Sequence, residues 1–211
     1  DKKIIEKNIF EGFHDTMRII NHQLKKTGAA SVKEFNLDIE EDKQPEIMSL
    51  GYVKNYVEKI SAQYNAFISN LNIKPDDETA YWFKQMENQF KSTLDQIFFL
   101  APWLSLSTVP AKYSSLEWIE QIPSLNELKV WNEALEEEIT MLSSEDKNSD
   151  EENNWLNDFK LSVSIGAKRA AELIAKAETV AQQCIGFADM EYNFLYDSSQ
   201  HLLAIGYNVE D

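Results

Sequence analysis

Apolar residues recur every three or four positions through most of the chain, a spacing typical of helices that bury one face. The pattern predicts helices over residues 2–26, 45–71, 77–101, 125–142 and 153–190. The second helix has the most regular stripe, with apolar residues alternately three and four apart: Leu50, Val53, Val57, Ile60, Tyr64, Phe67 and Leu71. We expect an antiparallel helical bundle, with a coiled-coil seam as the alternative for this helix.

Residues that favour helix ends stand at several of these boundaries. Asp76 or Asp77 can cap the third helix, and Pro102 ends it. Ser124 and Glu127 have the spacing of a capping box, in which each side chain bonds the other residue's backbone N–H. Residues 143–152 are polar and acidic, and this composition predicts a flexible loop between the last two helices.

The spacing changes after residue 190, where the sequence is typical of a strand, a turn and a second strand over residues 192–207. A lone hairpin is barely stable, so we expect this one either to pack on the bundle or to belong to a further domain. The predicted organisation is a helical bundle domain over residues 1–190, followed by a β-hairpin over residues 191–211 that begins the next domain. The predicted fold class is all-α, a bundle of about five long helices with a short C-terminal hairpin.

Charge and hydropathy exclude several classes of partner. The chain has 36 acidic and 20 basic residues and a net charge of −16, which disfavours nucleic acids and anionic membrane surfaces. The most apolar run, residues 97–106, is shorter than the roughly 20 residues that a membrane span needs, so no direct membrane insertion is expected. The chain begins at Asp1 rather than Met, so we expect it to be a piece of a longer protein.

Motifs of catalytic chemistry are missing from the sequence. The three histidines, His14, His22 and His201, form neither an H-E-x-x-H motif nor a cluster with cysteine, so no metal site is predicted. No G-x-S-x-G motif or glycine-rich phosphate loop is present, and no cofactor is expected. We predict no catalytic residue. Asp189, Glu191 and Asp197 stand among aromatic residues, and a glycosidase that uses Asp189 or Glu191 is the less favoured alternative. For Asp189 and Asp197 a cap or turn role is expected instead.

Two sets of residues are candidates for binding rather than catalysis. Trp103 and Trp118, in the aromatic link over residues 102–122, and Tyr196 in the hairpin can stack on sugar rings, although aromatic residues in such a link more often close one end of a core. The last predicted helix carries small residues on its apolar stripe, which allow close approach of another domain. The candidate docking residues are Gly166, Ala170, Ala177 and Ala181.

The C-terminal stretch resembles one family. Residues 188–197 (ADMEYNFLYD) and 202–209 (LLAIGYNV) are similar to the M-D-F-x-F-L-Y-D … L-F-S-I-G-Y-N-V stretch of cyclic β-1,2-glucan synthases, where it leads into a glycoamylase-like domain. Glu191-Tyr192 stands in place of the Asp-Phe pair, and Ala204 in place of the serine. Residues 11–16 (EGFHDT) are similar to the G-L-x-D-T opening of the helical region upstream of that domain.

The resemblance implies a very large, membrane-attached parent, a glycosyltransferase that uses UDP-glucose to build cyclic β-1,2-glucan. The chain is then expected to be a non-catalytic helical connecting segment on the cytoplasmic side of the inner membrane. Its expected partners are the other domains of the same polypeptide. The alternative is a helical module that binds β-1,2-glucan. None of the family's UDP-glucose-binding residues can be placed on this chain.

Overall fold

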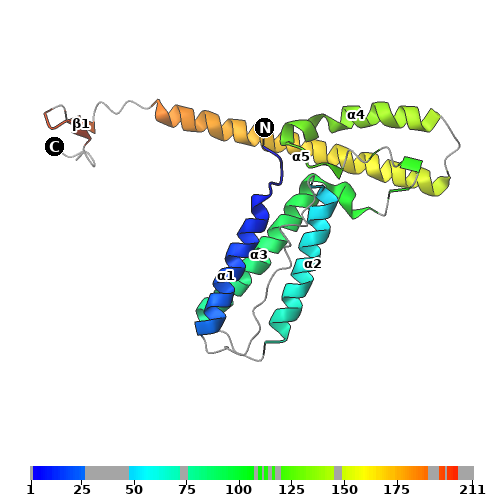
Figure 1. The fold of residues 1–211 in the computed structure, drawn as a ribbon. Helices are drawn as coiled ribbons and strands as arrows, with labels where there is room; N and C mark the ends of the chain where they lie inside the picture. The colour runs from blue at the N-terminus through cyan, green and yellow to red at the C-terminus, as the bar shows by residue number, and fades with distance from the viewer. Residues whose placement is uncertain are drawn as a thin grey trace. The chain divides into compact units, whose positions relative to one another are not determined.

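The computed structural model describes residues 2–26, 48–71, 76–106, 109–110, 112–113, 116, 120–144, 149–189, 195–197 and 199–203. These residues form five α-helices, a 3-10 helix and a two-stranded hairpin (Figure 1). The helices are α1 (Asn8–Lys26), α2 (Leu50–Ser69), α3 (Asp77–Leu100), η2 (Pro102–Ser105), α4 (Leu125–Ser144) and α5 (Asp150–Ala188). The predicted all-α class, with about five helices and a terminal hairpin, is confirmed.

Helix α3 is the centre of the first three helices, since it contacts both α1 and α2 (Figure 1). The ring of Phe90 on α3 lies 5.1 Å from that of Phe13 on α1 and 5.6 Å from that of Tyr64 on α2, measured between centroids. The Tyr64 hydroxyl donates a hydrogen bond of 3.0 Å to the carbonyl oxygen of Phe83, and burial raises the pKa of this phenol. The three helices therefore share an aromatic core in which the buried Tyr64 hydroxyl has a hydrogen-bond partner.

The first two helices begin later than the apolar pattern predicts. The predicted start of α1 at residue 2 is wrong because the backbone there pairs with another segment, where Ile4 N–H donates to the Pro123 carbonyl oxygen at 2.8 Å. The predicted start of α2 at Pro45 is wrong because Ser49 is the extended N-cap, and its hydroxyl accepts from Tyr52 N–H at 3.0 Å. At α3 the predicted cap is confirmed as Asp76, which accepts from Thr79 N–H at 2.7 Å.

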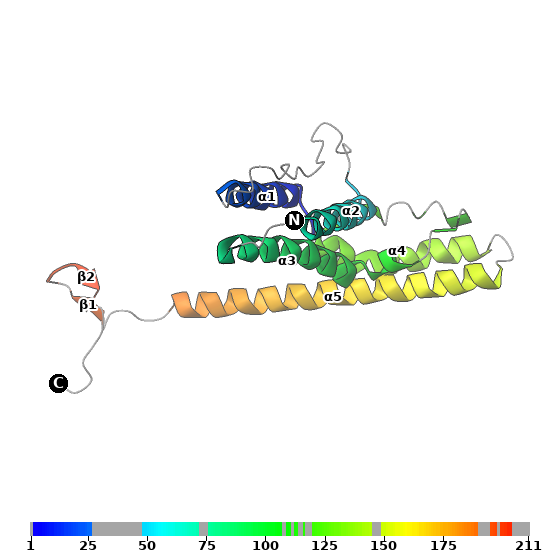
Figure 2. The same cartoon turned by 90° about the horizontal axis from the view of Figure 1, so that it is seen from below.

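Helices α4 and α5 begin with the same capping device and lie side by side in both views (Figures 1 and 2). The predicted capping box of α4 is confirmed, with Ser124 N–H 2.6 Å from a Glu127 carboxylate oxygen and Glu127 N–H 3.2 Å from the Ser124 hydroxyl. Ser149 and Glu152 form a second box, at 2.8 and 3.2 Å. The predicted loop over residues 143–152 is therefore too long, because α4 extends to Ser144 and α5 begins at Asp150.

The chain divides into two compact units, Asp1–Ala171 and Glu172–Asp211, and the division falls inside α5. A domain boundary at residue 190 stays a prediction. The second unit holds the end of α5 and an antiparallel hairpin of β1 (Tyr196–Asp197) and β2 (Leu202–Leu203). In this hairpin Tyr196 pairs with Leu203, and Asp197 with Leu202. The outer parts of the two predicted strands lie outside the described residues.

Candidate functional site

Gly166 is a point of close approach on α5. A Cβ added to this residue would lie 2.5 Å from the carbonyl oxygen of Leu100 and 2.9 Å from Cζ3 of Trp103. Atoms do not pack at such distances, so only glycine allows the end of α3 and the start of η2 to lie directly on this helix. Ala170, one turn further along α5, is fully buried. Gly166 and Ala170, two of the four residues predicted to dock another domain, are therefore covered by the first unit itself.

Trp103 is the aromatic residue that fills the space over Gly166. Its side chain is 5% exposed, and its ring centroid lies 5.7 Å from that of Trp131 on α4. Of the two roles weighed for this residue, the structure shows the one in which the indole closes the core. The flat face that would stack on a sugar already packs against protein.

Arg169 fastens the same part of α5 to the end of α3. Its Nη1 donates a hydrogen bond of 2.8 Å to the carbonyl oxygen of Phe99, and its guanidinium carbon lies 4.7 Å from the centroid of the Phe99 ring. The carbonyl is one of the last four of α3, which have no partner within their own helix. Arg169 thus provides a hydrogen-bond donor for a carbonyl at the C-terminal end of α3, and it lies just before the division between the two units.

The second part of α5, from Glu172 to Ala188, has a different environment. Ala177 and Ala181, the other two predicted docking residues, are both exposed. Large apolar side chains are exposed beside them: Val180 is 56% exposed, Ile185 55% and Phe187 67%. The docking role of Ala177 and Ala181 stays a prediction, but these two residues lie on a surface that the described chain leaves open.

A single apolar stripe runs through both parts of α5. The residues that form it alternate three and four apart without a break: Leu156, Phe159, Val163, Gly166, Ala170, Leu173, Ala177, Val180, Cys184 and Phe187. The predicted docking residues are the small ones of this stripe and leave out Leu173, Val180 and Phe187. The signal for them was the alternation itself, which is as regular here as in α2.

Of the remaining two predicted sugar-binding residues, the structure describes Tyr196. Trp118 lies outside the described residues. Tyr196 is 46% exposed in the hairpin, and its hydroxyl lies 3.1 Å from Nδ1 of His201. The sugar-binding role of Trp118 and Tyr196 stays a prediction.

Of the three acidic residues considered for glycosidase chemistry, the structure describes Asp189 and Asp197. Asp197 accepts hydrogen bonds from the Ser199 hydroxyl at 2.6 Å and the Ser199 N–H at 2.8 Å. These bonds lower the pKa of its carboxyl, and they give it the role of a turn residue. Asp189 is exposed directly after α5, and Glu191 lies outside the described residues.

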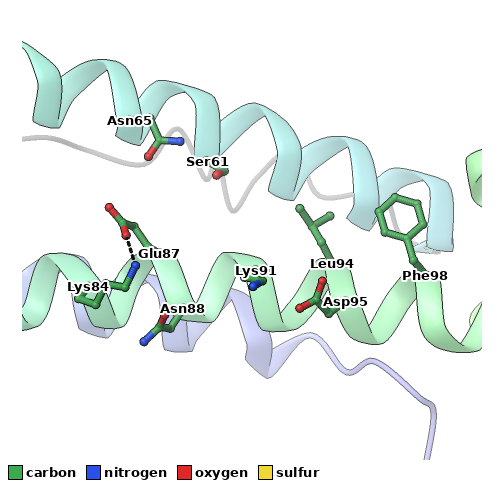
Figure 3. Close-up of a pocket in the computed structure, with 9 residues that line it drawn as sticks. All are labelled: Ser61, Asn65, Lys84, Glu87, Asn88, Lys91, Leu94, Asp95 and Phe98. Carbon is green, nitrogen blue, oxygen red and sulfur yellow. Dashed lines mark hydrogen bonds and ion pairs between the residues drawn. The ribbon is translucent and has the colours of Figure 1, made fainter.

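A groove of about 490 Å³ lies between α2 and α3 (Figure 3). Its lining carries two lysines and two acids, of which Lys84 and Glu87 form an ion pair of 2.8 Å. Ser61 and Asn65 face it from α2, and Leu94 and Phe98 form its apolar end on α3 (Figure 3). The charges balance, so the groove has no preference for an anion or a cation, and it holds no pair of converging unpaired acids within the described chain.

The described part of the chain contains no group of three histidine, cysteine or acidic side chains able to hold a metal ion. No described helix is long and apolar enough to cross a membrane. Comparisons with protein-family models, with curated proteins and with solved structures find no match.

Proposed function

We propose that this chain is a non-catalytic helical connecting segment of a larger carbohydrate enzyme of the cyclic β-1,2-glucan synthase type. The observation that carries the proposal is the length of α5 and its place in the chain. It is one helix of 39 residues, and it belongs to both compact units of the chain. At 1.5 Å per residue it is about 58 Å long, enough to hold two domains apart at a fixed separation.

The part of α5 that lies in the first unit supports a mechanical role. Gly166 lies against the backbone of Leu100, and Arg169 binds the Phe99 carbonyl oxygen, so the helix is fixed to the bundle at both positions. A helix that is held along one half transmits its direction to whatever is joined to its other half. The proposed role is therefore positional, and the proposed partners are the other domains of the same polypeptide.

The sequence resemblance supplies the identity of the parent within this proposal. The stretch that is similar to cyclic β-1,2-glucan synthases begins at Ala188, the last residue of α5. In the proposal, α5 leads directly into the glycoamylase-like domain of a membrane-attached, UDP-glucose-dependent enzyme. The segment itself would stand on the cytoplasmic side and contribute no residue to glucan synthesis.

The environments of the residues considered for sugar binding or hydrolysis support a connecting role rather than glucan binding. Trp103 is buried against Gly166 and Trp131, and Asp197 serves the hairpin turn. A module that holds a glucan chain needs exposed rings with polar groups beside them. Of the predicted sugar-binding residues that the structure describes, Trp103 is buried and Tyr196 is exposed.

The test is a calorimetric titration of linear β-1,2-gluco-oligosaccharide into the purified chain, with reducing ends counted in the same samples. Circular dichroism first establishes that the protein is helical. The proposal predicts no saturable heat at millimolar sugar and no new reducing ends. Saturable heat would replace the connecting role with glucan binding, and new reducing ends would make the chain a glycosidase.

A further inference from the structure

The exposed stretch of the α5 stripe has the properties of a helix-pairing surface. We name its five residues the α5 seam: Leu173, Ala177, Val180, Cys184 and Phe187. They continue, at the same three–four spacing, the stripe that the first unit buries from Leu156 to Ala170. Val180 is 56% and Phe187 67% exposed, whereas Phe159 and Val163 on the buried part are 1% and 0% exposed.

We propose that the α5 seam pairs with the α5 seam of a second copy of this chain, with the two helices antiparallel. The resulting contact is isologous, because the same surface of each copy meets itself across a twofold axis. This partner, a second copy, differs from the one expected from the small residues, which was another domain of the same polypeptide. Three observations favour the second copy.

The first observation is the order of large and small residues along the seam. Leu173, Val180 and Phe187 occupy one heptad position, and the small residues Ala177 and Cys184 occupy the other. In an antiparallel pair the two kinds of position face each other, so every small residue meets a large one. One register places Ala177 opposite Phe187 and Val180 opposite Cys184. A parallel pair would set small against small and large against large, which packs poorly.

The second observation is charge. The chain carries a net charge of −16, so two copies repel each other over most of their surfaces. Residues 173–187 contain only Lys176 and Glu178 as charged residues, and neither belongs to the seam. A second copy can therefore approach this neutral surface with the least repulsion. A partner that recognises this chain through its acidic charge would be basic, and the α5 seam offers such a partner no carboxylate.

The third observation is the way in which α5 already packs. At Gly166 its stripe receives a bulky neighbour, the Trp103 ring together with the Leu100 backbone. Ala181 and Ala188 flank the seam on one side, and both are exposed in the second unit. These small side chains leave the same kind of space for the Val180 and Phe187 side chains of a second copy.

The seam is about two heptads long, so the pairing is expected to be weak, with a dissociation constant on the order of micromolar. Light scattering coupled to size exclusion, and sedimentation equilibrium from about 5 to 500 µM, measure it directly. The proposal predicts a monomer that converts reversibly to a dimer within this range. A monomer at every concentration would overturn it, and so would a trimer or a larger open assembly.

Two matched variants assign the contact to the seam. Val180→Lys changes a seam residue, and Ile185→Lys changes a residue of almost the same exposure, 55% against 56%, about 140° around the helix. Val180→Lys is expected to raise the dissociation constant at least about tenfold, because it buries a charge at the contact. Ile185→Lys is expected to leave it unchanged. An equal effect of both variants would contradict pairing along the seam.

A third variant and a spectroscopic control keep the outcome clear. Ala177→Glu replaces a small seam residue that is exposed in the monomer, and it is also expected to prevent the dimer. Circular dichroism must show unchanged helix content in each variant. The result is independent of the proposed connecting role. A strictly monomeric chain overturns the pairing alone, and saturable sugar binding overturns the connecting role alone.

Discussion

The two parts of α5 have the same apolar pattern and opposite environments. Before Ala171 the stripe is buried, with Phe159 1% and Val163 0% exposed, and after Glu172 its residues are partly or largely exposed. Spacing alone therefore does not decide which half of a helix is buried. The deciding factor is what the rest of the chain brings to it, and the end of α3 and η2 contact the first half.

The largest expected effect comes from the same substitution made in each half. Phe159→Ala should destabilise the fold by about 3–5 kcal/mol, because it removes a buried ring that stacks on Trp155 at 4.9 Å. Phe187→Ala should change stability by less than about 0.5 kcal/mol, since Phe187 is 67% exposed. Urea denaturation of both variants below the dimerisation range measures the difference. Comparable losses would show that the second half is as firmly packed as the first.

Glycine offers a second matched pair, with effects of opposite sign. Gly166→Ala should destabilise the fold by about 1–3 kcal/mol, because its Cβ would lie 2.5 Å from the Leu100 carbonyl oxygen. At Gly186 nothing lies within 4 Å of an added Cβ. Gly186→Ala should therefore stabilise α5 by about 0.5–1 kcal/mol through helix propensity.

Thermal melts followed by circular dichroism provide the readout for both glycine variants. Stabilisation by Gly166→Ala would contradict the close approach of α3. Destabilisation by Gly186→Ala would show that another segment covers that position.

The smallest effect compares the starts of α4 and α5, which share a capping box but have different neighbouring lysines, Lys3 beside Glu127 and Lys112 near Glu152. Lys3 lies 2.8 Å from the Glu127 carboxylate, and this bond together with the Ser124 N–H holds the pKa of Glu127 at about 2, below its usual 4.5. Because the folded pKa is the lower one, this group stabilises the fold above pH 4.5. The contribution is lost as the pH falls from 4.5 towards 2.

Glu127→Gln should flatten this part of the stability profile. The effect should be below about 1 kcal/mol, since the pair is half exposed and screened by solvent. Denaturation of wild type and variant between about pH 2 and 6 tests the prediction, with Glu152→Gln as the control that lacks the Lys3 partner. A pH profile that is identical in wild type and Glu127→Gln would exclude a role for the Lys3 bond.

Most of the fold could be predicted from the sequence because its helices are amphipathic and begin at recognisable caps. The capping box of Ser124 and the cap at Asp76 identified two helix starts correctly. The start of α1 was missed for a reason that local spacing cannot reveal, since Ile4 pairs with Pro123, which is remote in sequence. The box of Ser149 and Glu152 was present in the sequence but was assigned to a loop because of its acidic surroundings.

The candidate site could be predicted only in part. Trp103 and Gly166 were both singled out, for different roles, and the structure places them in contact with each other. The sequence contains no signal that joins them, because the contact depends on how the end of α3 meets α5. The exposure of Val180 and Phe187 could not be predicted either, since their spacing equals that of the buried residues.

The most direct test of the account is the distance between two spin labels on α5, one in each compact unit. Cys184 is the chain's single cysteine and is exposed, and Leu161→Cys adds a second label at a residue that is 62% exposed. A continuous helix predicts a narrow distribution near 35 Å, from about 1.5 Å per residue. An excess of unlabelled protein removes signals between copies. A broad or much shorter distribution would contradict a connecting helix that runs unbroken from the bundle into the second unit.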